Sequence, residues 1–141
     1  MHGTIVCGVN QTPEARAAAQ LAAALAARLG LRLVLVHIVA ADREGDDVDE
    51  TLESVVHGLG EVEIRVLHGN RVDGLAKVAA DEGADAIVLG ARPRGARGRQ
   101  LRCTLARQLE AAQSVPVLIA PPATRARSGR RLGLAEAGAG R

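Results

Sequence analysis

The chain has 141 residues, with 18 basic and 16 acidic side chains and a formal net charge of +2, a length that suits a single domain. It contains no Phe, Tyr or Trp, so small aliphatic residues must fill the core, and the aromatic stacking used by single-strand nucleic-acid binders is excluded. No apolar run approaches the roughly 20 residues that span a bilayer and no signal-peptide pattern precedes the first expected strand, so we expect a cytoplasmic protein.

The first part of the chain predicts a strand, a helix and a second strand. Thr4–Val9 is an apolar, β-branched run that is typical of a buried strand. Thr12-Pro13-Glu14 predicts a helix start, because Thr caps, Pro fits the first turn and an acid favours the positive end of the helix dipole. Residues 33–39 predict a second buried strand. The apolar stripe expected on the helix, which Gly30 ends, is Ala18, Leu21, Leu25 and Leu29.

After the second strand, the sequence predicts an acidic loop, then a helix and a strand. Residues 41–49 predict a loop and residues 48–57 a short helix. The run of carboxylates here is typical of a solvated surface and not of a metal site, which needs ligands converging from elsewhere; its members are Asp46, Asp47, Asp49 and Glu50. Residues 62–67 alternate, with Glu63 and Arg65 on the wetter face, as expected of an edge strand.

The remaining elements follow the same alternation of helix and strand. Asn70 is expected to cap a helix over Arg71–Glu82 and Gly83 to end it, followed by a strand at 86–89 and a helix over 101–113. The buried stripe of that last helix is expected at Leu101, Leu105, Leu109 and Ala112. Val117–Ala120 predicts a fifth strand. The domain therefore covers residues 1–122, and the Arg-, Gly- and Ala-rich residues 123–141 are expected to form a disordered basic tail.

Charge is segregated along the chain. Residues 1–89 carry 7 basic and 14 acidic side chains, so 7 − 14 = −7, whereas residues 90–141 carry 11 and 2, so 11 − 2 = +9. All basic residues but Lys77 are arginines, whose planar fork grips phosphate or carboxylate through two bonds. A GC-rich genome explains the preference for arginine equally well, but it does not explain the segregation.

Alternating strands and helices predict an α/β fold with a doubly wound parallel sheet. At this point the chain resembles the universal stress protein family over Ile5 to Pro121. The resemblance rests on strand one running into Asn10-Gln11-Thr12-Pro13-Glu14, and on His37-Ile38-Val39, Gly69-Asn70, residues 83–90 and residues 115–119. It implies a flavodoxin-like, Rossmann-like sheet of five strands in the order 3-2-1-4-5. The switch point then lies between strands one and four, with Asn10 to Thr12 facing residues 90–104.

The resemblance also implies a candidate ATP site. The family loop reads glycine, two residues, glycine, nine residues, glycine, then serine or threonine. Here Gly90 and Thr104 match its ends, whereas Pro93 and Cys103 replace the two inner glycines. Proline removes an amide donor and cysteine adds a side chain where backbone approaches phosphate.

Two further positions of that site come from the first two strands. Asn10 stands where the family has an aspartate that holds the ribose or adenine, and Ile38 matches a position whose backbone meets adenine. We expect arginines to replace the lost amides through charge-assisted bonds. The candidate nucleotide contacts are Asn10, Gln11, Thr12, Ile38, Gly90, Arg92, Arg94, Cys103, Thr104 and Leu105.

Several functions remain open from the sequence. The first is a nucleotide-binding or nucleotide-sensing protein of the stress response, with ATP as a possible ligand. The second is a family member that has lost ATP and acts as a homodimeric interaction module, paired through strand five at the sheet edge, or that binds another anion through the arginine-rich loop. The third, weak salt-dependent nucleic-acid binding by that loop and the tail, is disfavoured.

Catalysis is not expected. The chain has no phosphate-loop lysine motif, no Gly-x-Gly-x-x-Gly, no Gly-x-Ser-x-Gly and no metal-type His/Cys cluster. We expect His37 to be a packed, hydrogen-bonded histidine and His68 a loop residue. We consider one redox hypothesis, that Cys103 is a redox-sensing thiol, because nearby arginines and a helix start both favour the thiolate. The default expectation is that Cys103 is an inert thiol.

Overall fold

Five parallel strands form one sheet in the order β3-β2-β1-β4-β5. The computed structural model describes residues 3–10, 12–39, 48–91 and 98–121, and for residues 98–104 it describes the backbone alone. The expected tail, residues 123–141, lies outside these ranges. The strands are β1 (Thr4–Val9), β2 (Arg32–Val39), β3 (Glu63–His68), β4 (Ala86–Gly90) and β5 (Val117–Ala120). The predicted fold class and strand order are therefore confirmed.

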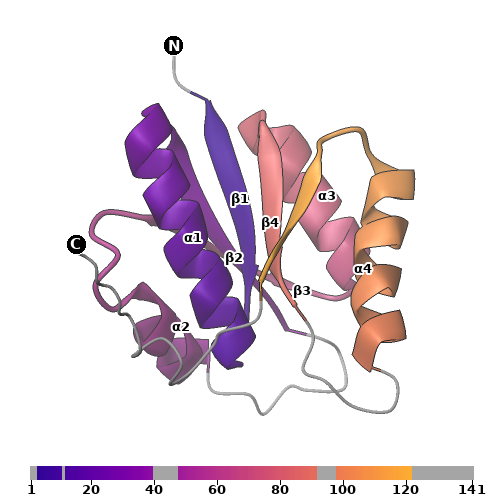
Figure 1. Cartoon of the computed structure of the whole chain (residues 1–141), viewed down its shortest axis with the longest axis horizontal. Helices are drawn as coiled ribbons and strands as arrows, with labels where there is room; N and C mark the ends of the chain where they lie inside the picture. The colour runs from indigo at the N-terminus through magenta and orange to yellow at the C-terminus, as the bar shows by residue number, and fades with distance from the viewer. Residues whose placement is uncertain (1–2, 11, 40–47, 92–97, 122–141) are drawn as a thin grey trace, which may run out of the picture.

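Helices cover both faces of the sheet (Figure 1). One buried cluster lies between the sheet and the first pair of helices, and a second lies on the opposite face beneath the other pair. The helices are α1 (Pro13–Leu29), α2 (Val48–Val56), α3 (Arg71–Glu82) and α4 (Gly98–Ala112). α4 thus begins before the expected residue 101. No helix in the described ranges is long and apolar enough to cross a membrane.

Short-range signals fix the helix ends. Thr12 Oγ1 accepts a hydrogen bond from Ala15 N at 3.1 Å, and Asn70 Oδ1 accepts one from Asp73 N at 3.0 Å, which satisfies a free amide at each helix start. Gly30 and Gly83 close α1 and α3 in the left-handed conformation, with φ of 70° and 62°. All four caps were predicted from the sequence.

The apolar stripe expected on α1 is right for Ala18, which is fully buried, and for Leu25, which packs against the core, but wrong for its other two members. Leu21 and Leu29 are 36% and 65% exposed. The buried face consists entirely of alanines, namely Ala15, Ala18, Ala19, Ala22 and Ala26. Small side chains let the helix backbone approach the sheet closely, and leucines in those positions would hold it away. Leu109 of α4 is fully buried as expected, whereas Ala112 is exposed.

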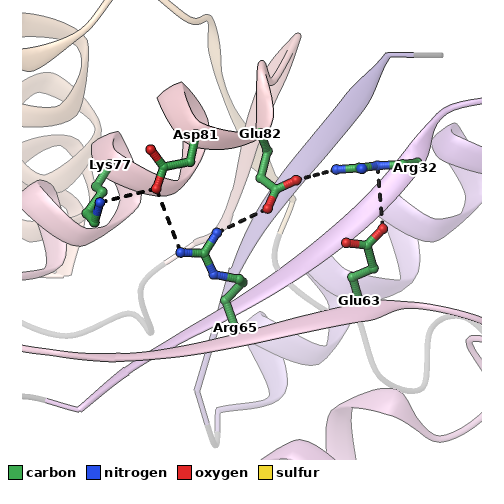
Figure 2. A network of polar contacts seen from close by, with 6 residues as sticks. All are labelled: Arg32, Glu63, Arg65, Lys77, Asp81 and Glu82. Atoms are coloured by element: carbon green, nitrogen blue, oxygen red, sulfur yellow. Dashed lines mark hydrogen bonds and ion pairs between the residues drawn. The ribbon is translucent and has the colours of Figure 1, made fainter. Parts of the chain in front are cut away.

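The edge position expected of β3 is confirmed and Glu63 is exposed as expected, but the other face of the strand is not the drier one. Ile64 and Val66 are 42% and 40% exposed, while Arg65 is half-buried against α3. Figure 2 shows the reason: Arg65 Nη1 lies 3.0 Å from Glu82 Oε2, and Arg32 of β2 pairs with the same carboxylate. The network continues through Arg32 to Glu63 at 3.5 Å, and through Asp81 to Arg65 at 3.8 Å and Lys77 at 3.2 Å. It ties the last turn of α3 to β2 and β3.

Candidate functional site

The carboxyl ends of β1 and β4 lie side by side, and the chain leaves them toward opposite faces of the sheet. β1 leads into α1 on one face and β4 leads toward α4 on the other (Figure 1). Ligands of open α/β sheets bind at such a switch point. A pocket with a cavity volume of about 90 Å³ lies here. It is lined by Gly8, Val9, Asn10, Thr12, Glu14, Ala15, Val36, Ile38, Arg71, Leu75, Leu89, Gly90, Ala91, Leu105 and Ile119.

Asn10 is engaged within its own turn. Its Oδ1 accepts two hydrogen bonds from Thr12, from the backbone amide at 2.9 Å and from the hydroxyl at 2.7 Å. Because a backbone amide can only donate, the atom that it contacts must be the amide oxygen of Asn10. The oxygen is therefore occupied, and the part of Asn10 left for a ligand is the Nδ2 donor, which has no partner among the described residues.

Glu14 is also a lining residue of the pocket, and one of its side-chain oxygens has no partner. Its Oε1 is buried and has no hydrogen-bond partner. Its residue occupies the first turn of α1, where the helix dipole favours a negative charge. A buried carboxylate oxygen without a donor is costly and calls for a partner.

The packing of β4 against α1 requires glycine at position 90, whether or not a ligand is bound. A Cβ on Gly90 would lie 2.5 Å from Glu14 O, 2.7 Å from Glu14 C and 3.1 Å from Ala15 N. The end of β4 therefore touches the backbone of the first turn of α1. The presence of glycine at this position is explained by packing, with or without a bound phosphate.

The deeper wall of the pocket is aliphatic. Val36 and Ile38 of β2, Leu75 of α3, Leu89 of β4 and Leu105 of α4 contribute to it. Their faces belong to the cluster beneath α3 and α4. Such a wall accepts a flat apolar ring, while the Asn10 and Glu14 end offers polar contacts.

The structure brings together half of the residues predicted for the site. Asn10, Thr12, Ile38, Gly90 and Leu105 all line the pocket. Gln11, Arg92 and Arg94 lie outside the described residues. Cys103 and Thr104 lie in the described backbone of α4, but their side chains do not belong to the described part.

Two charged lining residues were missed from the sequence. Glu14 was interpreted only as a favourable charge at a helix start, and Arg71 only as the first residue of a helix. The sequence does contain a signal for Arg71. The helix dipole disfavours a cation at a helix N-terminus, so an arginine at that position suits a nearby anion. Both helices begin after strands whose carboxyl ends face the same edge of the sheet, which places both residues at one rim.

The pocket at the switch point is not the largest hollow of the described surface. Its 90 Å³ is below the roughly 300–1,000 Å³ of small-molecule sites, so the described residues enclose only part of a nucleotide. A hollow of about 570 Å³ lies between α1 and the opposite, amino-terminal ends of β2 and β3. The switch point is preferred because loops and helix starts present their polar groups there.

Two buried titratable groups, His37 and Cys7, have structural environments. His37 is 5% exposed, and its Nδ1 donates to the carbonyl of Val9 at 3.1 Å, which agrees with the expected packed histidine. Burial raises the pKa of the Cys7 thiol from 9.0 to about 12, so Cys7 is inert at neutral pH. Within the described ranges, no three His, Cys, Asp or Glu side chains are grouped to hold a metal ion.

Comparisons with known proteins agree with this geometry. The universal stress protein family matches residues 1–58 and 41–121. A universal stress protein from Archaeoglobus fulgidus is 25% identical, with a TM-score of 0.67 over 86% of this chain and 100% of its own. A search of curated proteins found no match.

Two further solved structures carry nucleotides. A universal stress protein in complex with cAMP is 18% identical, with a TM-score of 0.64 over 86% of this chain and 99% of its own. An Archaeoglobus fulgidus universal stress protein in complex with dAMP is 22% identical, with a TM-score of 0.61 over 86% and 98%. At these identities the likeness shows the shared fold.

Proposed function

The chain belongs to the universal stress protein family, and we propose that it binds an adenine nucleotide at the switch-point pocket and acts as a non-catalytic, cytoplasmic sensor. One observation carries the proposal: five residues expected to contact nucleotide converge on one pocket at the carboxyl ends of β1 and β4. That two proteins of the same fold are described in complex with cAMP and dAMP supports an adenine nucleotide as the ligand.

The pocket suggests how the nucleotide lies. The adenine ring packs on the aliphatic wall beside Ile38 and Leu75, and the sugar lies toward Asn10 and Glu14. The phosphates extend beyond the enclosed volume toward the amino end of α4, where backbone amides favour anions. Arg92, Arg94 and Thr104 are proposed to contact them, which extends the site to ATP.

Equilibrium dialysis of the full chain against AMP, cAMP and magnesium-ATP tests the proposal. Since the chain has no aromatic residue, bound adenine is read directly by its near-ultraviolet absorbance. We expect saturable binding of one nucleotide per chain, recovered unhydrolysed. Ile38→Ala should weaken it about tenfold, because it removes apolar contact with the base worth about 1–2 kcal/mol.

The matched control is Ile64→Ala, which makes the same truncation on exposed β3. It should leave the affinity unchanged. Absence of saturable binding at millimolar concentrations of all three nucleotides would overturn the proposal. Release of hydrolysed product in step with protein concentration would overturn its non-catalytic part.

Self-association through β5 is a second proposal, carried by a separate observation. β5 ends the sheet, and Leu118 and Ile119, which point to opposite faces of it, are 43% and 39% exposed. An apolar edge strand with unpaired backbone groups pairs readily with a second copy. We propose a two-fold homodimer formed at this edge.

Light scattering over a range of concentrations tests the dimer. The unmodified chain should give twice the monomer mass, and Leu118→Lys should give the monomer. Ile64→Lys, the same change at the opposite edge of the sheet, should keep the dimer. A monomer at high concentration of the unmodified chain would rule out this proposal while leaving nucleotide binding untouched.

A further inference from the structure

The hollow of about 570 Å³ lies on the face of the sheet that α1 and α2 cover, at the amino ends of β2 and β3. Alanines of α1 form one wall, and the other wall is aliphatic, formed by Leu31, Leu33, Leu59 and Val62. These walls continue the buried cluster beneath α1, yet Ala27 on the α1 side is exposed. An open apolar hollow of this size suits an occupant with large aliphatic side chains.

The rim of the hollow is negatively charged. Arg32, the one cation among its described lining residues, pairs with Glu63 at 3.5 Å and also with Glu82. Glu61 is exposed and has neither a hydrogen bond nor an ion pair among the described residues. Residues 48–63, which lead from α2 into the hollow, carry five carboxylates and no Lys or Arg. The occupant should therefore combine aliphatic side chains with positive charge.

The carboxyl-terminal segment of this chain has that combination. Residues 123–141 carry five arginines and one acidic residue, so 5 − 1 = +4. Their two large aliphatic residues, Leu132 and Leu134, directly follow Arg130 and Arg131. Side chains two positions apart lie on the same side of an extended chain. Both leucines can therefore enter the hollow while the arginines stay near its rim.

The segment is also long enough to reach the hollow. Pro121 follows β5 at the carboxyl edge of the sheet, and β5 lies three strands from β2, which is about 14 Å at the usual strand spacing. The eight residues of β2 add about 26 Å along the strands, so the straight distance is about 30 Å. Residues 122–134, when extended, span up to about 43 Å, which leaves length to pass around α1.

We infer that the basic carboxyl-terminal segment docks in this hollow of its own chain. Leu132 and Leu134 cover the aliphatic wall, and Arg130 and Arg131 lie beside Glu61 and its neighbouring carboxylates. Docking removes apolar surface from water and brings opposite charges together. It thereby gives the segregation of charge along the chain a physical role, because the acidic first part binds the basic last part.

The test is the rate of disulfide formation between the segment and the hollow in a glutathione redox buffer. The full chain carries Cys103→Ser, since the remaining Cys7 is buried, with Ala27→Cys on the hollow wall and Gly133→Cys between the two leucines. Each rate is divided by the alkylation rate of the same cysteines. The disulfide should form at least about tenfold faster than in the control chain, because docking raises the local concentration of one thiol around the other. Leu132→Ser with Leu134→Ser should remove this advantage, and high salt should reduce it.

The matched control carries Ala111→Cys in place of Ala27→Cys. Ala111 is an exposed alanine near the end of α4, the helix that packs beside β5 on the opposite face (Figure 1), so an undocked segment reaches it at least as easily. Equal rates in the two chains, or a faster rate with Ala111→Cys, would overturn the inference. A disulfide that joins two chains, seen as a doubled mass, would also overturn it and would assign the hollow to the segment of a second copy. None of these results bears on nucleotide binding at the switch point.

Discussion

Replacing Gly90 with alanine is expected to lower the free energy of unfolding by about 1–3 kcal/mol, the usual cost of overpacking. The added Cβ would lie 2.5 Å from the Glu14 carbonyl oxygen and 2.7 Å from its carbon. These are backbone atoms of a capped helix start and cannot rotate away, so β4 and α1 must separate. Denaturant unfolding followed by circular dichroism measures the loss.

Gly8→Ala is the matched control for Gly90→Ala. Gly8 is also a strand glycine at the pocket, but its Cβ would meet only leucine side chains, Leu89 Cδ2 at 3.2 Å and Leu75 Cδ2 at 3.4 Å. Those methyl groups can shift, so the loss should be well below that of Gly90→Ala. Equal losses at the two positions would show that the close approach of β4 and α1 is not what requires glycine.

The second large effect is a fall in stability above pH 9 that arises from Cys7. Burial raises the pKa of Cys7 from 9.0 to about 12 in the folded chain. Below pH 9 the thiol is neutral in both states and contributes no slope. Above pH 9 the unfolded chain loses this proton and the folded chain keeps it. The free energy of unfolding should therefore fall by up to about 1.4 kcal/mol per pH unit until pH approaches 12.

The composition makes this profile easy to read. The chain has no tyrosine, and Lys77 is its single lysine, so few other groups titrate between pH 9 and 11. Denaturant unfolding of Cys7→Ala at pH 8, 9, 10 and 11 should show a lower baseline from the lost packing, and a flatter slope. Cys103→Ala should retain the slope. An unchanged slope in Cys7→Ala would contradict the assignment.

The burial of Cys7 allows the reactivity of Cys103 to be measured in the unmodified chain. Cys7 is fully buried in β1, so alkylation of the folded chain at neutral pH should report on Cys103 alone. The hypothesis that Cys103 is an activated thiol stays a prediction. It requires Cys103 to alkylate faster than a free model thiol.

Gly90 also changes how the altered loop motif is understood. The resemblance assigned three glycines to phosphate binding, and the chain keeps only the first. The structure shows that this first glycine is needed for packing against Glu14 and Ala15. Retention of Gly90 is therefore expected even in a chain whose ligand differs from ATP, and ligand choice must be tested at other lining residues such as Ile38.

The sequence by itself determined the order of the elements and the ends of α1 and α3. Thr12, Asn70, Gly30 and Gly83 act within a few residues of their own position, so local chemistry suffices to place them. The apolar runs of β1 and β2 required burial on both faces, and the doubly wound order followed from the family resemblance. The crevice between β1 and β4, with Asn10, Thr12 and Gly90 at its rim, came from that order.

Only the tertiary structure decided which polar atoms near that crevice already have hydrogen-bond partners. Asn10 was predicted as a ligand contact, and its oxygen proved to be used by Thr12. Glu14 was predicted as a helix-start charge, and it proved to carry a buried oxygen with no partner. Burial depends on segments far apart in sequence meeting in space, as β4 meets α1 at Gly90. The pattern of residues along one helix or strand does not show which distant segment will pack against it.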